Sequence, residues 1–129
     1  MRGKADNPEP RESPATGEAG ASGEAAPHPR VLRGKGLSID YVRRRVLAGG
    51  QEVPLTPLEW ALLEHLSRNH GQVISHKTLK AVLWGSEDVG DAALSACIRR
   101  LRLKLEDDPR MPRLILSRRG LGYVFLLSH

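Results

Sequence analysis

The segment D-A-A-L-S-A-C-I-R-R-L-R-L-K-L, residues 91–105, decides the fold of this chain. Its large apolar residues recur at steps of four, three and four, which predicts one face of an α-helix. They are Leu94, Ile98, Leu101 and Leu105. On a helical wheel these four side chains lie within about 40° of one another. The remaining surface begins with small residues and continues with basic ones, namely Ala92, Ser95, Ala96, Arg99, Arg100, Arg102 and Lys104.

A helix with one apolar face and one small-and-basic face has two interpretations. It is suited to the major groove of double-stranded DNA, because small residues allow close approach and arginines reach phosphates and base edges. It is equally typical of a surface helix whose arginines face only water. The rest of the chain has to decide between the two.

Composition favours one ordinary globular domain. The chain has 129 residues, of which 40% are hydrophobic and 27% charged. No apolar run reaches the roughly 18 residues of a membrane span, and the N-terminus lacks the apolar core of a secretory signal. A single cysteine, Cys97, excludes an internal disulfide and is expected to be a small core residue rather than a nucleophile. We therefore expect a cytoplasmic protein without a membrane partner.

The placement of charge says more than its total of +5. Residues 99–119 hold eight basic and three acidic side chains, so most of the excess lies in one short region. Such a concentration is typical of a patch that binds a polyanion.

Residues 1–30 differ from the rest of the chain. They contain five prolines and four glycines and show no hydrophobic periodicity, which predicts a disordered tail or linker. The domain is expected to occupy residues 31–129.

Short β-like runs separated by turn residues follow, and they predict a small antiparallel meander over residues 37–55. Pro54 cannot donate to a strand ladder and is expected at an edge or strand end. Arg43, Arg44 and Arg45 lie in a predicted turn, where we expect them to be solvated or paired with acids rather than bound to nucleic acid.

The clearest local signal is T-P-L-E at residues 56–59. Thr56 is placed to accept from the N–H of Glu59, and Glu59 to accept from the N–H of Thr56, as in a capping box with proline at the first helical position. The predicted helix has an apolar face of Leu58, Leu62, Leu63 and Leu66, with Trp60 covering the core from the side and Gly71 ending it.

A second helix is predicted to begin at the N-cap Ser75 and to end at Trp84 and Gly85. Its inward residues are expected to be Leu79, Val82 and Leu83.

Beyond residues 106–109, E-D-D-P, two β-like runs flank R-R-G-L-G and predict a hairpin. Arg118 and Arg119 lie at its tip, where a narrow minor groove would attract them.

The sequence offers no candidate catalytic or metal site. His65, His70 and His76 are spaced by five and six residues and do not share a helical face, so we expect no metal and no other cofactor. Paired carboxylates, a nucleophile with its base, and a phosphate-binding loop are all missing, so an enzyme is not expected.

Several longer motifs resemble the C-terminal effector domain of OmpR/PhoB-type response regulators. They are L-T-P-L-E-W-A-L-L-E-H-L, G-Q-V-I-S-H-K-T-L-K-A-V-L-W-G, I-R-R-L-R-L-K-L-E-D-D-P and R-R-G-L-G-Y-V-F, in unbroken order over about residues 36–127. The resemblance implies an α+β fold, a winged helix-turn-helix with a four-stranded N-terminal antiparallel sheet, three helices and a C-terminal β-hairpin wing. It also implies that helix 91–106 enters the major groove and that wing 114–126 enters the minor groove.

The resemblance also implies roles for individual residues. Arg99, Arg100 and Arg102 match positions that contact DNA, with Arg100 as the reader of a base edge. Arg119, beside Arg118, matches the wing residue that enters the minor groove. Contacts with the DNA backbone are implied for Ser117, Tyr123 and Trp84. Ser95 and Ala96 join the candidate DNA contacts because their small side chains allow close approach. Loop 85–90 occupies the place of a segment that touches RNA polymerase, and members of the family bind tandem repeats as head-to-tail dimers.

The chain departs from the family at several places. Ala92 and Ala93 replace a frequent Arg-Thr, and Cys97 replaces a frequent histidine, so polar contacts there are fewer. Leu103 lies opposite the apolar stripe and is expected to be exposed, with a neighbouring subunit as one possible contact. We expect no receiver domain upstream of Val31.

Two functions follow. The first is sequence-specific binding of double-stranded DNA for transcription regulation. The alternative is a winged-helix protein-interaction module whose basic face is incidental, using loop 85–90 and Leu103.

Overall fold

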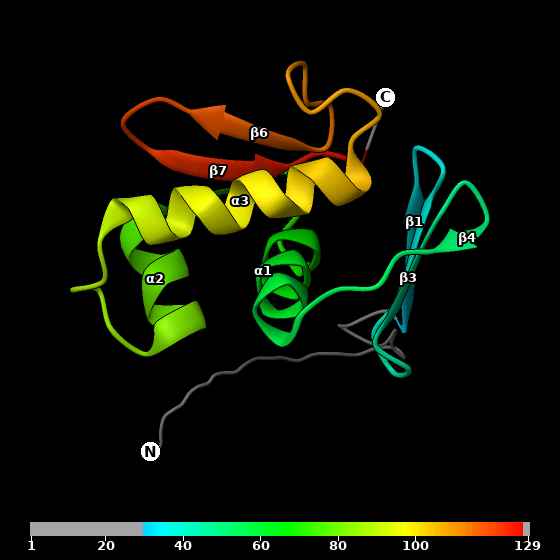
Figure 1. Cartoon of the computed structure of the whole chain (residues 1–129), viewed down its shortest axis with the longest axis horizontal. Helices are drawn as coiled ribbons and strands as arrows, with labels where there is room; N and C mark the ends of the chain where they lie inside the picture. The colour runs from blue at the N-terminus through cyan, green and yellow to red at the C-terminus, as the bar shows by residue number, and fades with distance from the viewer. Residues whose placement is uncertain (1–29, 128–129) are drawn as a thin grey trace, which may run out of the picture.

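The computed structural model describes residues 30–127 as an α+β winged helix, as predicted (Figure 1). The elements in chain order are β1 (Val31–Gly34), β2 (Leu37–Asp40), β3 (Arg45–Ala48), β4 (Gln51–Glu52), α1 (Pro57–Arg68), β5 (Val73–Ser75), α2 (His76–Trp84), α3 (Asp91–Leu105), β6 (Ile115–Arg118) and β7 (Gly122–Phe125). The predicted tail lies outside the described residues, except for Arg30. None of the three helices within residues 30–127 is long and apolar enough to cross a membrane.

The N-terminal sheet is antiparallel in the order β1-β2-β3-β4. Leu37, Ile39 and Val46 point into the core, and their neighbours on the strands are half-buried or exposed. The meander predicted over residues 37–55 omitted β1, whose four residues show little alternation in burial. Pro54 follows the last strand, as expected.

The three arginines at the β2–β3 turn are exposed, but each contacts a side chain of the same domain. Arg43 pairs with Asp40 at 3.2 Å and Arg45 with Glu52 at 2.8 Å, which confirms the expected pairing with acids. The guanidinium of Arg44 lies 5.6 Å from the ring centroid of Trp60.

The hydrophobic core of the domain is built around helix α1. Its capping box is formed as predicted, with Glu59 N donating to Thr56 Oγ1 at 3.2 Å and Thr56 N donating to Glu59 Oε1 at 3.0 Å. Leu62, Leu63 and Leu66 of α1 pack in one cluster with the apolar stripe of α3. Trp60 is itself buried and packs edge-on against Tyr41, so it belongs to the core more fully than predicted.

In α2 the predicted inward set was wrong at one position. Val82 is 44% exposed, whereas Lys80 is buried. Leu79 and Leu83 lie one turn apart and define the inner line of this short helix, and Val82 falls beside that line. Lys80 is accommodated because its Nζ donates to Asp91 Oδ1 at 2.7 Å, at the start of α3.

The C-terminal hairpin is part of a three-stranded antiparallel sheet in the order β5-β7-β6. Strand β5 directly precedes α2, and its three residues were not predicted as a strand. A Cβ at residue 122 would lie 1.9 Å from the carbonyl oxygen of Ile74. Strands β5 and β7 can therefore approach each other this closely only because residue 122 is glycine.

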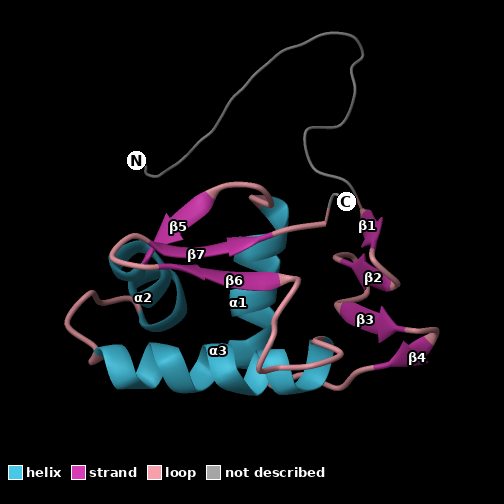
Figure 2. Cartoon of the chain, turned by 90° about the horizontal axis from the view of Figure 1, so that it is seen from above, coloured by secondary structure: helices cyan, strands magenta, loops and turns pink. Residues whose placement is uncertain are grey.

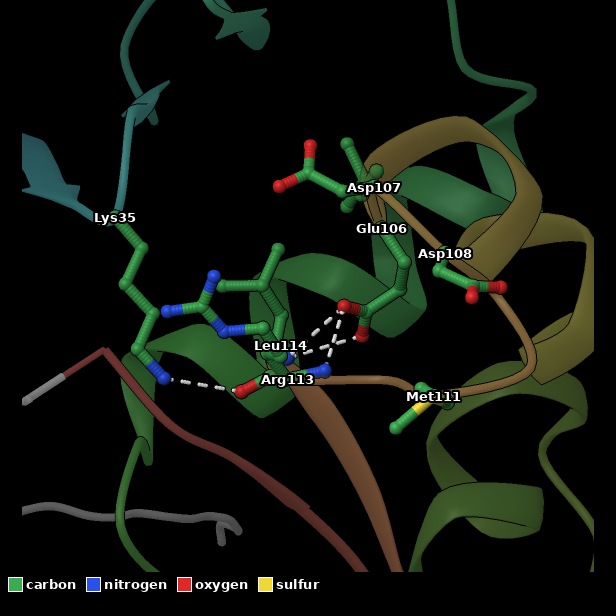
Figure 3. Close-up of a pocket in the computed structure, with 8 residues that line it drawn as sticks. Lys35, Glu106, Asp107, Asp108, Met111, Arg113 and Leu114 are labelled. Atoms are coloured by element: carbon green, nitrogen blue, oxygen red, sulfur yellow. Dashed lines mark hydrogen bonds between the residues drawn. The ribbon is translucent and has the colours of Figure 1, made fainter.

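The loop between α3 and β6 is organised by a buried carboxylate. Glu106 accepts hydrogen bonds from the backbone N–H groups of Arg113 and Leu114 at 2.8 to 3.1 Å (Figure 3). It also accepts one from the N–H of Ile115 at 2.8 Å. On the same loop, Lys35 of the β1–β2 turn donates to Arg113 O at 3.0 Å. The end of α3 is thus fixed to the first strand of the hairpin.

Acid is expected to destabilise the domain in two stages. Burial lowers the pKa of His65 below its ordinary value of 6.5, so the unfolded chain takes up a proton that the folded chain excludes. Stability is therefore lost as the pH falls through about 6.5. The pKa of Glu59 is lowered from 4.5, and the stability that this carboxylate contributes is lost as the pH falls from about 4.5 through the lower pKa of the folded state.

Urea unfolding at pH 5, 6 and 7 tests the first stage. The loss of stability should disappear in His65→Gln and persist in His70→Gln, an exposed control. An unchanged pH dependence in His65→Gln would contradict this assignment.

Candidate nucleic-acid interface

The candidate interface begins with the exposed face of α3, which runs along the outside of the domain (Figure 2). Leu94, Ile98, Leu101 and Leu105 are buried, as the stripe predicted, and Cys97 is buried beside them, as expected of a small core residue. Burial raises the pKa of the Cys97 thiol, consistent with a core residue rather than a nucleophile. The exposed residues of α3 are Asp91, Ala92, Ser95, Ala96, Arg99, Arg100, Leu103 and Lys104. After Asp91, the first half of this face carries small side chains, and the second half carries three basic residues and Leu103.

Two of these basic residues meet a buried acid from α1. Lys104 Nζ donates to Glu59 Oε1 at 2.5 Å, and Arg100 Nε lies 3.6 Å from Glu59 Oε2. Burial alone would raise the pKa of the Glu59 carboxyl, but the hydrogen bonds from Lys104 and the Thr56 N–H outweigh it and lower the pKa. Glu59 therefore stays ionised beneath the basic end of α3.

Arg102 joins α3 to the hairpin instead of extending freely into solvent. Its Nε donates to Ile115 O at 3.0 Å and its Nη2 donates to Ser117 Oγ at 3.0 Å. Its guanidinium also lies 5.9 Å from the ring centroid of Tyr123. Arg102 and Ser117, both predicted to contact DNA, thus contact each other. A contact of Arg102 with DNA has to use the guanidinium N–H groups that are not in these two hydrogen bonds.

The turn of the hairpin carries Arg118 and Arg119, both exposed. In both views this turn lies toward the end of the domain where α3 begins (Figures 1 and 2). Tyr123 at the start of β7 is only 9% exposed, because its ring packs 5.4 Å from that of His76. This low exposure limits the predicted contact of Tyr123 with the DNA backbone to a small part of the residue.

The junction of α2 and α3 contains the remaining predicted residue. Trp84 is half-buried at the last position of α2, and Gly85 follows it with a φ of +73° as a left-handed C-cap. Loop 85–90 then leads into α3, and Lys80 and Asp91 tie its two flanks together. This ion pair lowers the pKa of Asp91.

Sequence reasoning missed the role of Glu59 beyond its cap and the burial of Lys80. It placed Lys104 on the basic face but did not predict the bond of Lys104 to Glu59. For Glu59 the sequence indicated only the capping role. For Lys80 it gave no sign that the side chain is buried. Among residues 30–127, no cluster of His, Cys, Asp or Glu could hold a metal ion.

Comparisons with known proteins agree with this geometry. Residues 50–125 match the family described as "Transcriptional regulatory protein, C terminal". The chain is 36% identical over 96 residues to the transcriptional regulatory protein KdpE of Mycobacterium tuberculosis, covering 74% of this chain and 42% of that protein. It is 43% identical over 88 residues to AfsQ1 of Streptomyces coelicolor, covering 67% of this chain and 39% of that protein. The chain thus spans less than half the length of these relatives.

Solved structures show the same fold. The DNA-binding domain of Klebsiella pneumoniae RstA, solved in complex with the RstA box, superposes with a TM-score of 0.71 at 32% identity, covering 78% of this chain and all of that one. The response regulator DrrB of Thermotoga maritima, an OmpR/PhoB homolog, also gives 0.71, at 30% identity, with 75% of this chain and 44% of that chain covered. The chain belongs to the family of C-terminal domains of transcriptional regulatory proteins, of the OmpR/PhoB type.

Proposed function

We propose that this domain binds double-stranded DNA in a sequence-specific manner to regulate transcription. In this proposal α3 enters the major groove with Ser95, Ala96, Arg99 and Arg100, and the hairpin turn enters the minor groove with Arg118 and Arg119. Trp84, Ser117, Tyr123 and the remaining donor of Arg102 contact the sugar-phosphate backbone. The cytoplasm is the compartment in which we expect it to act.

The observation that carries the proposal is the connection made by Arg102. Its hydrogen bonds to Ile115 and Ser117 hold the exposed face of α3 and the basic hairpin in a fixed relation. Two basic elements held in this way can contact adjacent grooves of one duplex together. The relatives named as transcriptional regulators, and RstA with its bound DNA, support the same function.

Two alanine variants test the proposal. Arg100→Ala should weaken binding to a selected duplex by about 1–3 kcal/mol and relax the preference at one base pair, because a bidentate arginine contact is lost. Arg119→Ala should weaken binding to all sequences more evenly and reduce the salt slope by about 1. Fluorescence anisotropy at several salt concentrations measures both effects. Arg43→Ala is the control, because Arg43 pairs with Asp40 in the N-terminal sheet. Equal affinity of the unaltered protein for selected and scrambled duplexes would contradict the proposal.

We further propose that two copies bind as a head-to-tail dimer on tandem sites and that loop 85–90 contacts RNA polymerase. The resemblance to the family supports both. The spacing of half-sites in duplexes selected from a random pool tests the dimer. Crosslinking from this loop to polymerase on a promoter tests the second contact.

The alternative, a protein-interaction module, is favoured by one observation. Leu103 is 60% exposed within the face assigned to DNA. A salt titration separates the two functions, since DNA binding through arginines must weaken steeply with salt and an apolar protein contact need not.

A further inference from the structure

The acid Glu59 lies between the start of α1 and the basic face of α3. The residue is 1% exposed, so its charge has to be compensated by close partners. Its Oε1 atom accepts from Lys104 Nζ and from the backbone N–H of Thr56. Oε2 faces Arg100 Nε at 3.6 Å. One carboxylate oxygen therefore serves the cap and Lys104, and the other is directed at Arg100.

Arg100 combines this internal contact with an outward one. Its side chain is 53% exposed, although its Nε lies beside a buried carboxylate. Because the ion pair uses Nε, it does not occupy the two terminal amino groups of the guanidinium. Since the side chain is more than half exposed, an external acceptor can approach this end of the guanidinium.

We propose that Glu59 is a positioning residue that orients the guanidinium of Arg100 for reading a base edge. This inference rests on the proposed function, in which Arg100 is the base reader. A carboxylate behind the guanidinium restricts a long side chain to fewer conformations before DNA arrives. Arg100 then loses less conformational freedom on binding. The gain in affinity arises only at the correct base pair, where the oriented guanidinium meets its acceptors.

The inference predicts opposite changes in specificity and in non-specific affinity. Without the Glu59 charge, Arg100 is no longer oriented, and discrimination between duplexes falls. Removing a negative charge beside the DNA-binding face also strengthens attraction to phosphates in general. General damage to the fold would instead weaken binding to every duplex.

The substitution Glu59→Gln separates these effects. Glutamine also serves at the third helical position of a capping box, so the start of α1 is preserved while the charge is lost. Glu52→Gln is the matched control, because it makes the same change of charge at an exposed ion pair on β4. The measured quantities are the Kd values for a duplex selected by the unaltered protein and for a scrambled duplex.

We expect Glu59→Gln to lower the ratio of selected to scrambled affinity about two- to tenfold, the range for ordering one long side chain on binding. Scrambled binding should stay equal to or tighter than that of Glu52→Gln. In an Arg100→Ala background, Glu59→Gln should cause no further loss of discrimination. An unchanged ratio in Glu59→Gln, or a further loss in that background, would overturn the inference and leave the proposed function standing. A native protein that does not discriminate would overturn both.

Should Glu59→Gln fail to fold, the Nε–Hε signal of Arg100 in the NMR spectrum of the unaltered protein gives a second answer. A signal that exchanges slowly with water and is less mobile than that of the exposed Arg99 supports the inference. Mobility equal to that of Arg99 overturns it.

Discussion

Glu106→Ala is expected to lower the free energy of unfolding by about 3–5 kcal/mol, since removing a buried acceptor leaves its donors unsatisfied. The three N–H groups that Glu106 accepts belong to the backbone at the start of β6 and cannot turn to another partner. Urea unfolding followed by circular dichroism measures the effect.

Asp107→Ala is the control, because it removes the same charge from the neighbouring residue, whose side chain is exposed. We expect it to change stability by less than about 0.5 kcal/mol, as for most surface substitutions. A Glu106→Ala variant as stable as Asp107→Ala would show that the loop does not depend on this carboxylate.

Gly122→Ala is expected to destabilise the domain by about 3 kcal/mol and to separate β5 from β7. The added Cβ would lie 1.9 Å from Ile74 O and 2.7 Å from Ile74 C, both backbone atoms that cannot move independently of the strand. Thermal unfolding measures the loss, and amide exchange at residues 73–75 should accelerate because the ladder opens there first.

Gly120→Ala serves as the comparison. Gly120 has a φ of +75° but nothing within 4 Å of an added Cβ, so only backbone strain is introduced. We expect about 1 kcal/mol from that strain. Equal losses in the two variants would show that the close approach of β5 and β7 is not what requires glycine at residue 122.

The parts of the fold that the sequence predicted are those encoded locally. The stripe from Leu94 to Leu105 specifies which face of α3 is buried, and T-P-L-E specifies the start of α1 through bonds within one turn. The hairpin was predicted because glycines and arginines interrupt two β-like runs. Strands β1 and β5 were missed because each is a short strand whose pairing depends on a distant partner.

The side-chain roles were less predictable, and long charged residues explain why. Lys80 occupies a buried position because Asp91, eleven residues away, neutralises it. Arg102 was expected to reach DNA, and nothing in the sequence indicated that it also contacts β6 through Ile115 O and Ser117 Oγ. Periodicity shows which face of a helix a residue occupies, but the partner of a flexible cation depends on the three-dimensional arrangement.

Under the proposed function, the connection through Arg102 also bears on how the DNA sites of this domain can vary. If α3 and the hairpin cannot shift relative to each other, the bases under them must keep a constant separation along the duplex. One inserted base pair would displace one of the two contacts by about 3.4 Å. Promoters that use this domain should therefore tolerate point substitutions within a half-site far better than insertions or deletions.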